Sequence, residues 1–287
     1  SSRFTHGRAP RTARGPTGLG DPDMSLAIVT ATLDPLRAID CTSSWTEMSW
    51  GSITYYMVWQ GIDHGPLTGW HAGSAKVVNG RQHTIYNYGS PEILGVVPAF
   101  AIGVQQALED GHDIIACFHD DLLIEDHSWD LWVTRLLEDN PQVGLCGFGG
   151  GIGLGDGDIY QTPYNPMQLA RQGFVSNMRD ATAHGARSLL PVQVACLDGF
   201  SQVGRREYWQ GEDRTPAANV VKRLLDKQAD EMVGVEGLSD IRLRYPEGNL
   251  FAKMQSWGII HHAYDAALGC FAKRLGYQVW MLPIACH

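Results

Sequence analysis

The sequence predicts an α/β fold in which a mostly parallel, Rossmann-like mixed sheet is flanked by helices. Short apolar runs typical of buried strands alternate with segments of helical periodicity over the first 150 residues. This alternation is typical of doubly wound sheets, because parallel strands need a long crossover that a helix supplies. A second observation is that polar residues follow the apolar runs directly, where ligands bind in such folds. The 287 residues, 44% of them hydrophobic, are enough for a sizeable core.

The first elements are expected to be strands at residues 25–32, 54–60 and 84–88, with a helix at 35–45 after the first strand. The first strand reads Ser-Leu-Ala-Ile-Val-Thr-Ala-Thr, an apolar run that stops at a polar turn. The second is rich in aromatic and β-branched side chains, and the third is a shorter run of the same kind.

The next elements surround an acidic pair. Residues 97–109 carry apolar side chains at helical spacing and are followed by a glycine, which predicts a helix. The apolar run 113–118 predicts a buried strand that leads directly into His119-Asp120-Asp121. A further helix is expected at 128–138, before an Asn-Pro stop, and a strand at 143–148.

The second half is less regular. Residues 159–190 show no periodic pattern. A strand is expected at 192–197, a partly charged helix at 217–232, a helix at 263–275 that a glycine closes, and a last strand at 278–282.

One segment, Gly147–Asp158, is dense in glycine. Its spacing fits no G-x-G-x-x-G motif, and it lacks the lysine of a phosphate-binding P-loop. Given glycine's conformational freedom, we expect a mobile loop here rather than a dinucleotide cradle.

The chain divides into an arm and one two-part domain. Residues 1–23 hold four arginines and no apolar period, which predicts a flexible basic arm or an upstream extension, with a nucleic-acid or membrane arm as the alternative. Residues 24–150 and 151–287 are interpreted as two halves of the same domain.

Charge and composition exclude several classes of protein. The net charge of −9 argues against a broad nucleic-acid binder, which normally presents a basic face. The six cysteines are scattered without a C-x-x-C motif, so a zinc cluster is not expected. The same pattern predicts a cytoplasmic protein whose cysteines are reduced. No run of 18 apolar residues occurs, so no membrane span is expected.

The pair Asp120-Asp121 is the strongest candidate for chemistry. Two carboxylates at the end of an apolar strand can hold a hard divalent cation that also binds a nucleotide diphosphate. Asp-Asp pairs are also common in solvated turns, but the buried strand and the adjacent histidine favour a functional role.

Four segments together resemble the nucleotide-sugar-dependent glycosyltransferases of the GT-A fold, most closely those of family 2. Residues 28–34 resemble the opening strand and turn of that family. Residues 118–122 are similar to its DXD motif, and residues 197–200 to its acceptor-side strand and turn. Residues 262–265 open a helix similar to its Glu-Asp helix.

The resemblance implies a role for each matching residue and Mn²⁺ or Mg²⁺ as the cofactor. The donor, a nucleoside-diphosphate sugar, would contact Thr30, Thr32, Gln60 and Asp120. The metal ligands would be Asp121, His119 and His287. The acceptor would contact Asp198, Gly199, Trp209 and Trp257. Asp265 would be the catalytic general base, and a single base opposite the leaving group gives in-line attack with inversion.

The sequence leaves two rival functions open. Ala31, Gln60 and His119 replace the usual proline and two aspartates, which is what a binding protein that has lost catalysis would show. A His/Asp metal-dependent phosphohydrolase is the other rival. Its metal cluster would be built from His112, His119-Asp120, Asp126-His127 and His261-His262.

The acceptor is left open by the sequence. Glycans, small molecules, lipid-linked or protein acceptors and a modified base in DNA all fit. The arginines of the arm, with Lys222-Arg223, Arg242 and Arg244, would supply phosphate contacts for a DNA acceptor.

Overall fold

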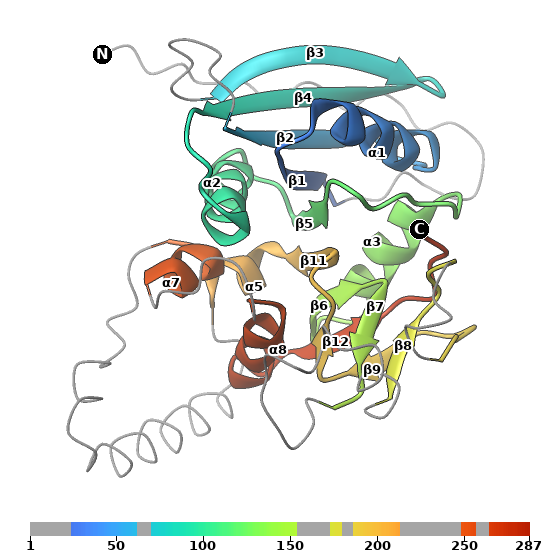
Figure 1. Cartoon of the computed structure of the whole chain (residues 1–287). Helices are drawn as coiled ribbons and strands as arrows, with labels where there is room; N and C mark the ends of the chain where they lie inside the picture. The colour runs from blue at the N-terminus through green and yellow to red at the C-terminus, as the bar shows by residue number, and fades with distance from the viewer. Residues whose placement is uncertain (1–23, 62–69, 154–172, 180–185, 213–247, 257–263) are drawn as a thin grey trace, which may run out of the picture.

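The structure is a computed structural model, and it describes residues 24–61, 70–153, 173–179, 186–212, 248–256 and 264–287. A nine-stranded mixed sheet organises it, in the order β3-β4-β2-β1-β5-β11-β6-β12-β9 (Figure 1). Its strands are β1 (Leu26–Thr32), β2 (Ile53–Gln60), β3 (Trp70–Val78), β4 (Arg81–Ser90), β5 (Ile114–His119), β6 (Val143–Gly147), β9 (Val192–Val194), β11 (Ser201–Arg205) and β12 (Gln278–Met281).

The centre of the sheet is parallel, and three strands run against it. β4, β2, β1 and β5 pair in parallel, as do β6 and β12. β11 is antiparallel to both of its neighbours, β5 and β6. β5 and β6 therefore run in the same direction. β3 and β9 are antiparallel strands at the two edges. The expected α/β class with a mostly parallel sheet is therefore confirmed.

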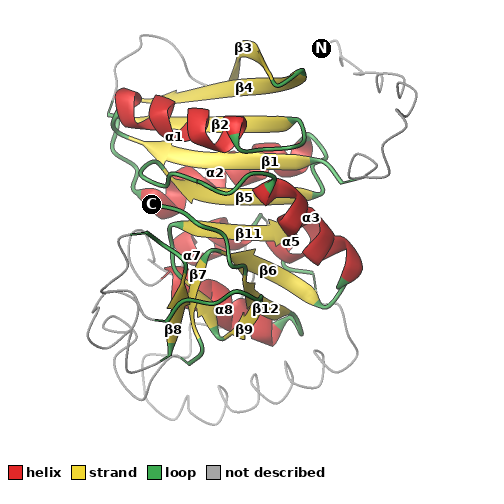
Figure 2. Ribbon diagram, turned by 90° about the vertical axis from the view of Figure 1, so that its right-hand side faces the viewer, coloured by secondary structure: helices red, strands yellow, loops and turns green. Residues whose placement is uncertain are grey.

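Helices cover both faces of the sheet (Figure 2). One face carries α1 (Pro35–Glu47) and α3 (Trp129–Asp139). The other carries α2 (Val96–Glu109), α5 (Arg206–Gln210), α7 (Leu250–Ser256) and α8 (Tyr264–Arg274).

The strand pattern explains this sandwich. Ala27 and Val29 of β1 belong to the core under α2, whereas Leu26 and Ile28 belong to the core under α1. Alternate residues of a strand face opposite sides, so a strand buried on both faces reads as a continuous apolar run. α1 begins where Asp34 caps it, with its Oδ1 accepting from the backbone N–H of Leu36 at 3.0 Å.

The glycine segment corrects one expectation. Gly149–Gly151 form β7, a buried strand between β10 (Cys196–Leu197) and β8 (Phe174–Ser176) in a second sheet, rather than a mobile loop. A Cβ atom at Gly150 would lie 2.5 Å from the Cys196 carbonyl oxygen. Gly150 is therefore needed for the close approach of β7 to β10. Residues 154–158 of this segment, and the helix expected at 217–232, lie outside the described residues.

Other differences are in extent. The strand expected at 192–197 is split between the two sheets, β9 in one and β10 in the other. β3, β11, α5 and α7 have no counterpart among the expected elements. In the part of the chain that the structure describes, no helix has both the length and the apolar character needed to cross a bilayer.

Candidate functional site

The carboxyl ends of β1, β2, β4 and β5 meet at one edge of the sheet, because these strands are parallel and adjacent. Ala31 pairs with His119 and Thr32 with Trp59, so Thr32, Gln60 and His119 all end their strands at this edge. The polar strand ends that the sequence singled out are therefore brought together. Ligands of doubly wound sheets bind at such an edge.

A hydrogen bond joins the end of β1 to the acidic pair. The Thr32 hydroxyl lies 2.6 Å from Oδ2 of Asp120, and the Cys41 thiol of α1 donates to the Asp120 carbonyl oxygen at 3.1 Å. Burial, and then the charge of Asp120, raises the pKa of Cys41 to about 12, so this thiol stays protonated. Asp120 is half-buried, whereas Asp121 is exposed and open to a ligand.

A second link runs from β5 to α8. Nε2 of His119 lies 2.6 Å from the hydroxyl oxygen of Tyr264, and the same hydroxyl donates to the Gly199 carbonyl oxygen at 3.0 Å. Burial lowers the pKa of His119, although the carboxylates of Asp121 and Asp120 act in the opposite direction. Since Tyr264 precedes Asp265, this link brings the first turn of α8 to the end of β5.

Two further carboxylates lie close together behind this link. Asp265 is 0% exposed in the first turn of α8, and Asp198 follows β10. Burial, reinforced by the charges of Asp265 and Asp121, raises the pKa of Asp198 to about 7. A carboxyl that resists ionisation beside a second carboxylate is typical of functional sites and costs stability.

We expect Asp198→Asn to stabilise the protein more at pH 8 than at pH 5. In the unfolded chain Asp198 ionises near its ordinary pKa, whereas the folded state holds its proton up to about pH 7. The wild-type fold therefore loses stability as the pH rises between these values, and the asparagine variant does not. Thermal unfolding of both proteins at the two pH values measures the effect. An equal difference at both would contradict the shifted pKa.

The last residues of the chain return to the acidic pair. The backbone N–H of Leu123 donates to the His287 carbonyl oxygen, and that of His287 donates to the Leu123 carbonyl oxygen, both at 2.8 Å. Cys286 forms an isolated antiparallel bridge with Ile124. His287 is therefore held two residues from Asp121 along the paired segment, with an exposed side chain.

Several predicted site residues serve the fold instead. Thr30 is fully buried, and its hydroxyl oxygen has no hydrogen-bond partner among the described residues, so its contact with the donor stays a prediction. Gln60 is buried, and its Oε1 accepts from the Gly95 N–H at 2.9 Å, at the start of α2. Trp209 is 0% exposed and donates to the Ile115 carbonyl oxygen at 2.9 Å, which corrects its expected contact with an acceptor. Trp257 lies outside the described residues.

Gly199 also has a structural role. Its carbonyl oxygen accepts from Tyr264, and a Cβ atom at this position would collide with the Tyr264 hydroxyl. The glycine therefore permits the close approach of the β10–β11 turn to α8. Direct contact of Gly199 with an acceptor is still only a prediction.

Within the described ranges, no three His, Cys, Asp or Glu side chains gather into a ready metal site. Asp121, Asp120 and His119 nevertheless suit a cation that arrives with a diphosphate. Mg²⁺ is commonly bound by one or two carboxylates together with substrate phosphates and water, rather than by an all-protein cage.

Sequence reasoning missed Tyr264 and Cys41 as members of this site. The one available signal for Tyr264 was its place in the sequence directly before the predicted base, Asp265. Cys41 lies on the buried face of α1 and reaches Asp120 only because α1 packs across the end of β5.

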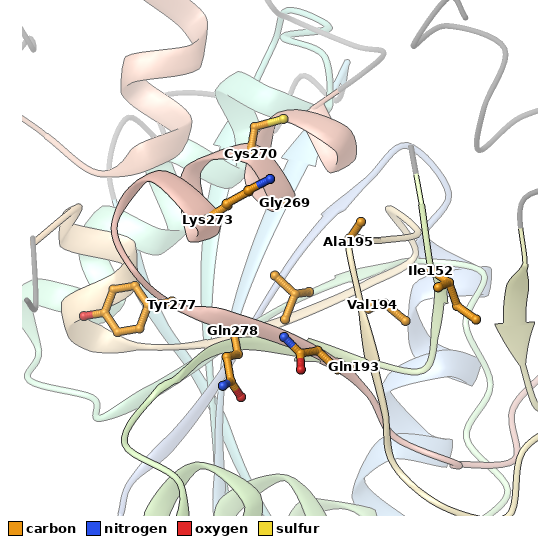
Figure 3. Close-up of a pocket in the computed structure, with 10 residues that line it drawn as sticks. Ile152, Gln193, Val194, Ala195, Gly269, Cys270, Lys273, Tyr277 and Gln278 are labelled. Atoms are coloured by element: carbon orange, nitrogen blue, oxygen red, sulfur yellow. The ribbon is translucent and has the colours of Figure 1, made fainter. Parts of the chain in front are cut away.

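A cavity of about 630 Å³ lies elsewhere, against α8, β9 and β12 (Figure 3). Lys273, Cys270 and Tyr277 line it with Gln193 and Gln278, and it includes no predicted site residue. In Figure 3 the side chains of Cys270, Lys273 and Tyr277 do not converge on one point.

Comparison with protein-family models gives no match for this chain, and comparison with curated proteins gives none. The evidence for function is therefore the geometry of the site.

Proposed function

We propose that the protein transfers a sugar from a nucleoside-diphosphate sugar to an acceptor hydroxyl, with a divalent cation and with inversion. The observation that carries this proposal is the meeting of two sets of carboxylates from distant parts of the chain. Asp120 and Asp121 end a parallel strand, while Asp198 and Asp265 approach from α8 and the β10–β11 turn. One set would hold the cation that stabilises the charge on the departing diphosphate, and the other would remove the proton of the acceptor hydroxyl.

On the donor side, the structure supports a smaller set of residues than the sequence indicated. Thr32 and Asp120 form one hydrogen-bonded unit that would bind the ribose or diphosphate. The exposed carboxylate of Asp121 would hold Mn²⁺ or Mg²⁺, with His119 and His287 as the nearby nitrogen ligands. The cation would supply charge stabilisation for the leaving diphosphate.

On the acceptor side, Asp265 would accept the proton of the attacking hydroxyl. Its carboxylate is fully covered in this structure, so an acceptor would have to replace the groups that now cover it. Asp198, which holds its own proton up to about pH 7, would keep the paired site from carrying two full negative charges. It remains the proposed acceptor contact.

The phosphohydrolase alternative receives no support from the described residues. His112 precedes β5, and His119 ends it, so the strand separates the two histidines. Nε2 of His112 lies 3.1 Å from the Tyr56 hydroxyl, in a buried cluster away from the acidic pair. His261-His262 lies outside the described residues. A non-catalytic nucleotide-sugar-binding protein has the same donor site and differs only in lacking turnover.

Calorimetric titration with UDP, GDP, TDP and CDP, each with Mn²⁺ and with EDTA, tests the donor site. We expect one nucleotide to bind in the presence of Mn²⁺ and to lose most of its affinity in EDTA. Absence of metal-dependent binding to all four would refute the proposal. A panel of the matching nucleotide-sugars with glycan, small-molecule and DNA acceptors then separates an enzyme, which consumes a donor, from a binding protein, which does not.

A further inference from the structure

His119 stands where the resemblance leads one to expect a carboxylate, and its contacts show what the imidazole does there. Its Nε2 meets the Tyr264 hydroxyl at 2.6 Å, and that hydroxyl meets the Gly199 carbonyl oxygen at 3.0 Å. The ring also stacks on Phe100, with centroids 6.3 Å apart and planes inclined by 28°. The imidazole is therefore fixed both in its plane and at one of its nitrogens.

The protons available along the hydrogen-bonded series His119–Tyr264–Gly199 determine which nitrogen of His119 carries hydrogen. A carbonyl oxygen only accepts, so the single hydroxyl proton of Tyr264 is used on Gly199. The Tyr264 oxygen must then accept from His119, which makes Nε2 the donor. In a neutral imidazole only one ring nitrogen carries hydrogen, so the second nitrogen, Nδ1, keeps its lone pair. The two nitrogens point to opposite sides of the ring, and Nδ1 faces away from Tyr264.

This arrangement is the one that metal-binding histidines normally have. Their second ring nitrogen donates to a carbonyl, a carboxylate or an equivalent acceptor, which fixes the tautomer and the orientation of the ring. In the described structure that acceptor is Tyr264, itself anchored on Gly199, and Asp120 and Asp121 follow His119 directly.

We propose that Tyr264 is a positioning residue that holds His119 as the Nε2–H tautomer, so that Nδ1 is presented as a ligand for a divalent transition-metal ion beside Asp121. This inference rests on the metal dependence of the proposed function. It adds a preference, because an imidazole nitrogen suits divalent transition-metal ions, whereas an all-oxygen site suits Mg²⁺. A neutral ligand in place of a carboxylate also lowers the negative charge at the cation.

The tautomer is tested first, without nucleotide or activity. In protein labelled with ¹⁵N histidine, each tautomer gives a separate pattern of magnetic-resonance signals. The pattern that disappears in His119→Gln belongs to His119. We expect protonated Nε2 and bare Nδ1 in the wild type, and a mixture of tautomers in Tyr264→Phe, which keeps the ring beside Phe251 but loses the hydroxyl. Protonated Nδ1 in the wild type would overturn the role of Tyr264.

The ligand role is tested with a matched pair of variants. The amide oxygen of asparagine falls near the position of Nδ1, and the amide nitrogen of glutamine near that of Nε2. Titration of Mn²⁺ alone, followed by the loss of its free-ion spin-resonance signal, should give a smaller loss of affinity for His119→Asn than for His119→Gln. Affinity should fall 10- to 100-fold for Tyr264→Phe, the range found when the partner of a metal-bound histidine is removed. It should fall at least as far for His119→Gln, which has no acceptor at Nδ1.

Competition with Mg²⁺ completes the test. Wild-type protein should hold Mn²⁺ against excess Mg²⁺, and His119→Gln should lose this preference. Retention of both affinity and preference by His119→Gln, or no binding of Mn²⁺ to the wild type, would overturn the inference. Failure of the proposed function is recognised separately, because it appears as absent nucleotide binding in the calorimetry while the tautomer is unaffected.

Discussion

Asp265→Asn should lower the rate of sugar transfer by about 10²- to 10⁴-fold, the usual contribution of a general base. The amide has nearly the shape of the carboxylate but does not accept a proton from the acceptor hydroxyl. Asp265 belongs to α8, whereas Thr32 and Asp120 form the proposed donor-binding unit at the ends of β1 and β5, so donor binding should be unchanged. The rate is measured with the donor and acceptor that the panel identifies, and donor affinity by calorimetry.

A matched control is Asp113→Asn. This aspartate lies before β5, at the opposite end of the strand from His119, where Oδ2 accepts from the Ser25 N–H at 2.9 Å. Its replacement removes the same charge from the other edge of the sheet and should leave the transfer rate unaffected. An unimpaired Asp265→Asn variant would reject Asp265 as the base and leave it a structural carboxylate.

Gly147→Ala should lower the free energy of unfolding by about 3 kcal/mol, at the upper end of what overpacking usually costs. Gly147 ends β6, and an added Cβ atom would collide with the backbone carbonyl oxygen of Ser201 in β11. A backbone atom inside a sheet does not move aside without separating the strands. Thermal unfolding of the purified variant measures the loss.

Gly149→Ala is the matched control for Gly147→Ala. A Cβ atom at Gly149 would lie 3.0 Å from two atoms of the Phe200 ring, which can shift, and no backbone atom is among its nearest neighbours. We expect a clearly smaller loss of stability. Equal losses for both variants would contradict the view that contact between β6 and β11 demands glycine at position 147.

The strands with a strong apolar signal were predictable, and those without one were not. β1, β2 and β5 are buried on both faces, so their apolar runs mark them almost to the residue. β7 is a run of three glycines whose burial depends on Cys196 and Phe174 across the sheet, and glycine has no side chain to give a local pattern. β11 contains serine, glutamine and glycine and likewise has no apolar pattern. Its position in the sheet is determined by pairing with β5 and β6.

The candidate site follows the same division. The edge where Asp120 and Asp121 lie could be predicted, because parallel strands end together. The sequence does not predict which polar atoms at this edge remain available to a ligand. The amide oxygen of Gln60 accepts a hydrogen bond at the start of α2, and Trp209 is buried in the core. The partnership of His119 with Tyr264 joins residues 145 positions apart and has no local signal.

The place of β11 in the sheet has a consequence for dissecting the protein. This strand comes late in the chain, yet it pairs with both β5 and β6, which come early. A fragment that ends before β11 would leave both of those strands with open, apolar edges, which are templates for aggregation. The two halves are therefore expected to fold only together. A truncated protein carrying residues 24–150 should precipitate rather than yield an isolated nucleotide-binding module.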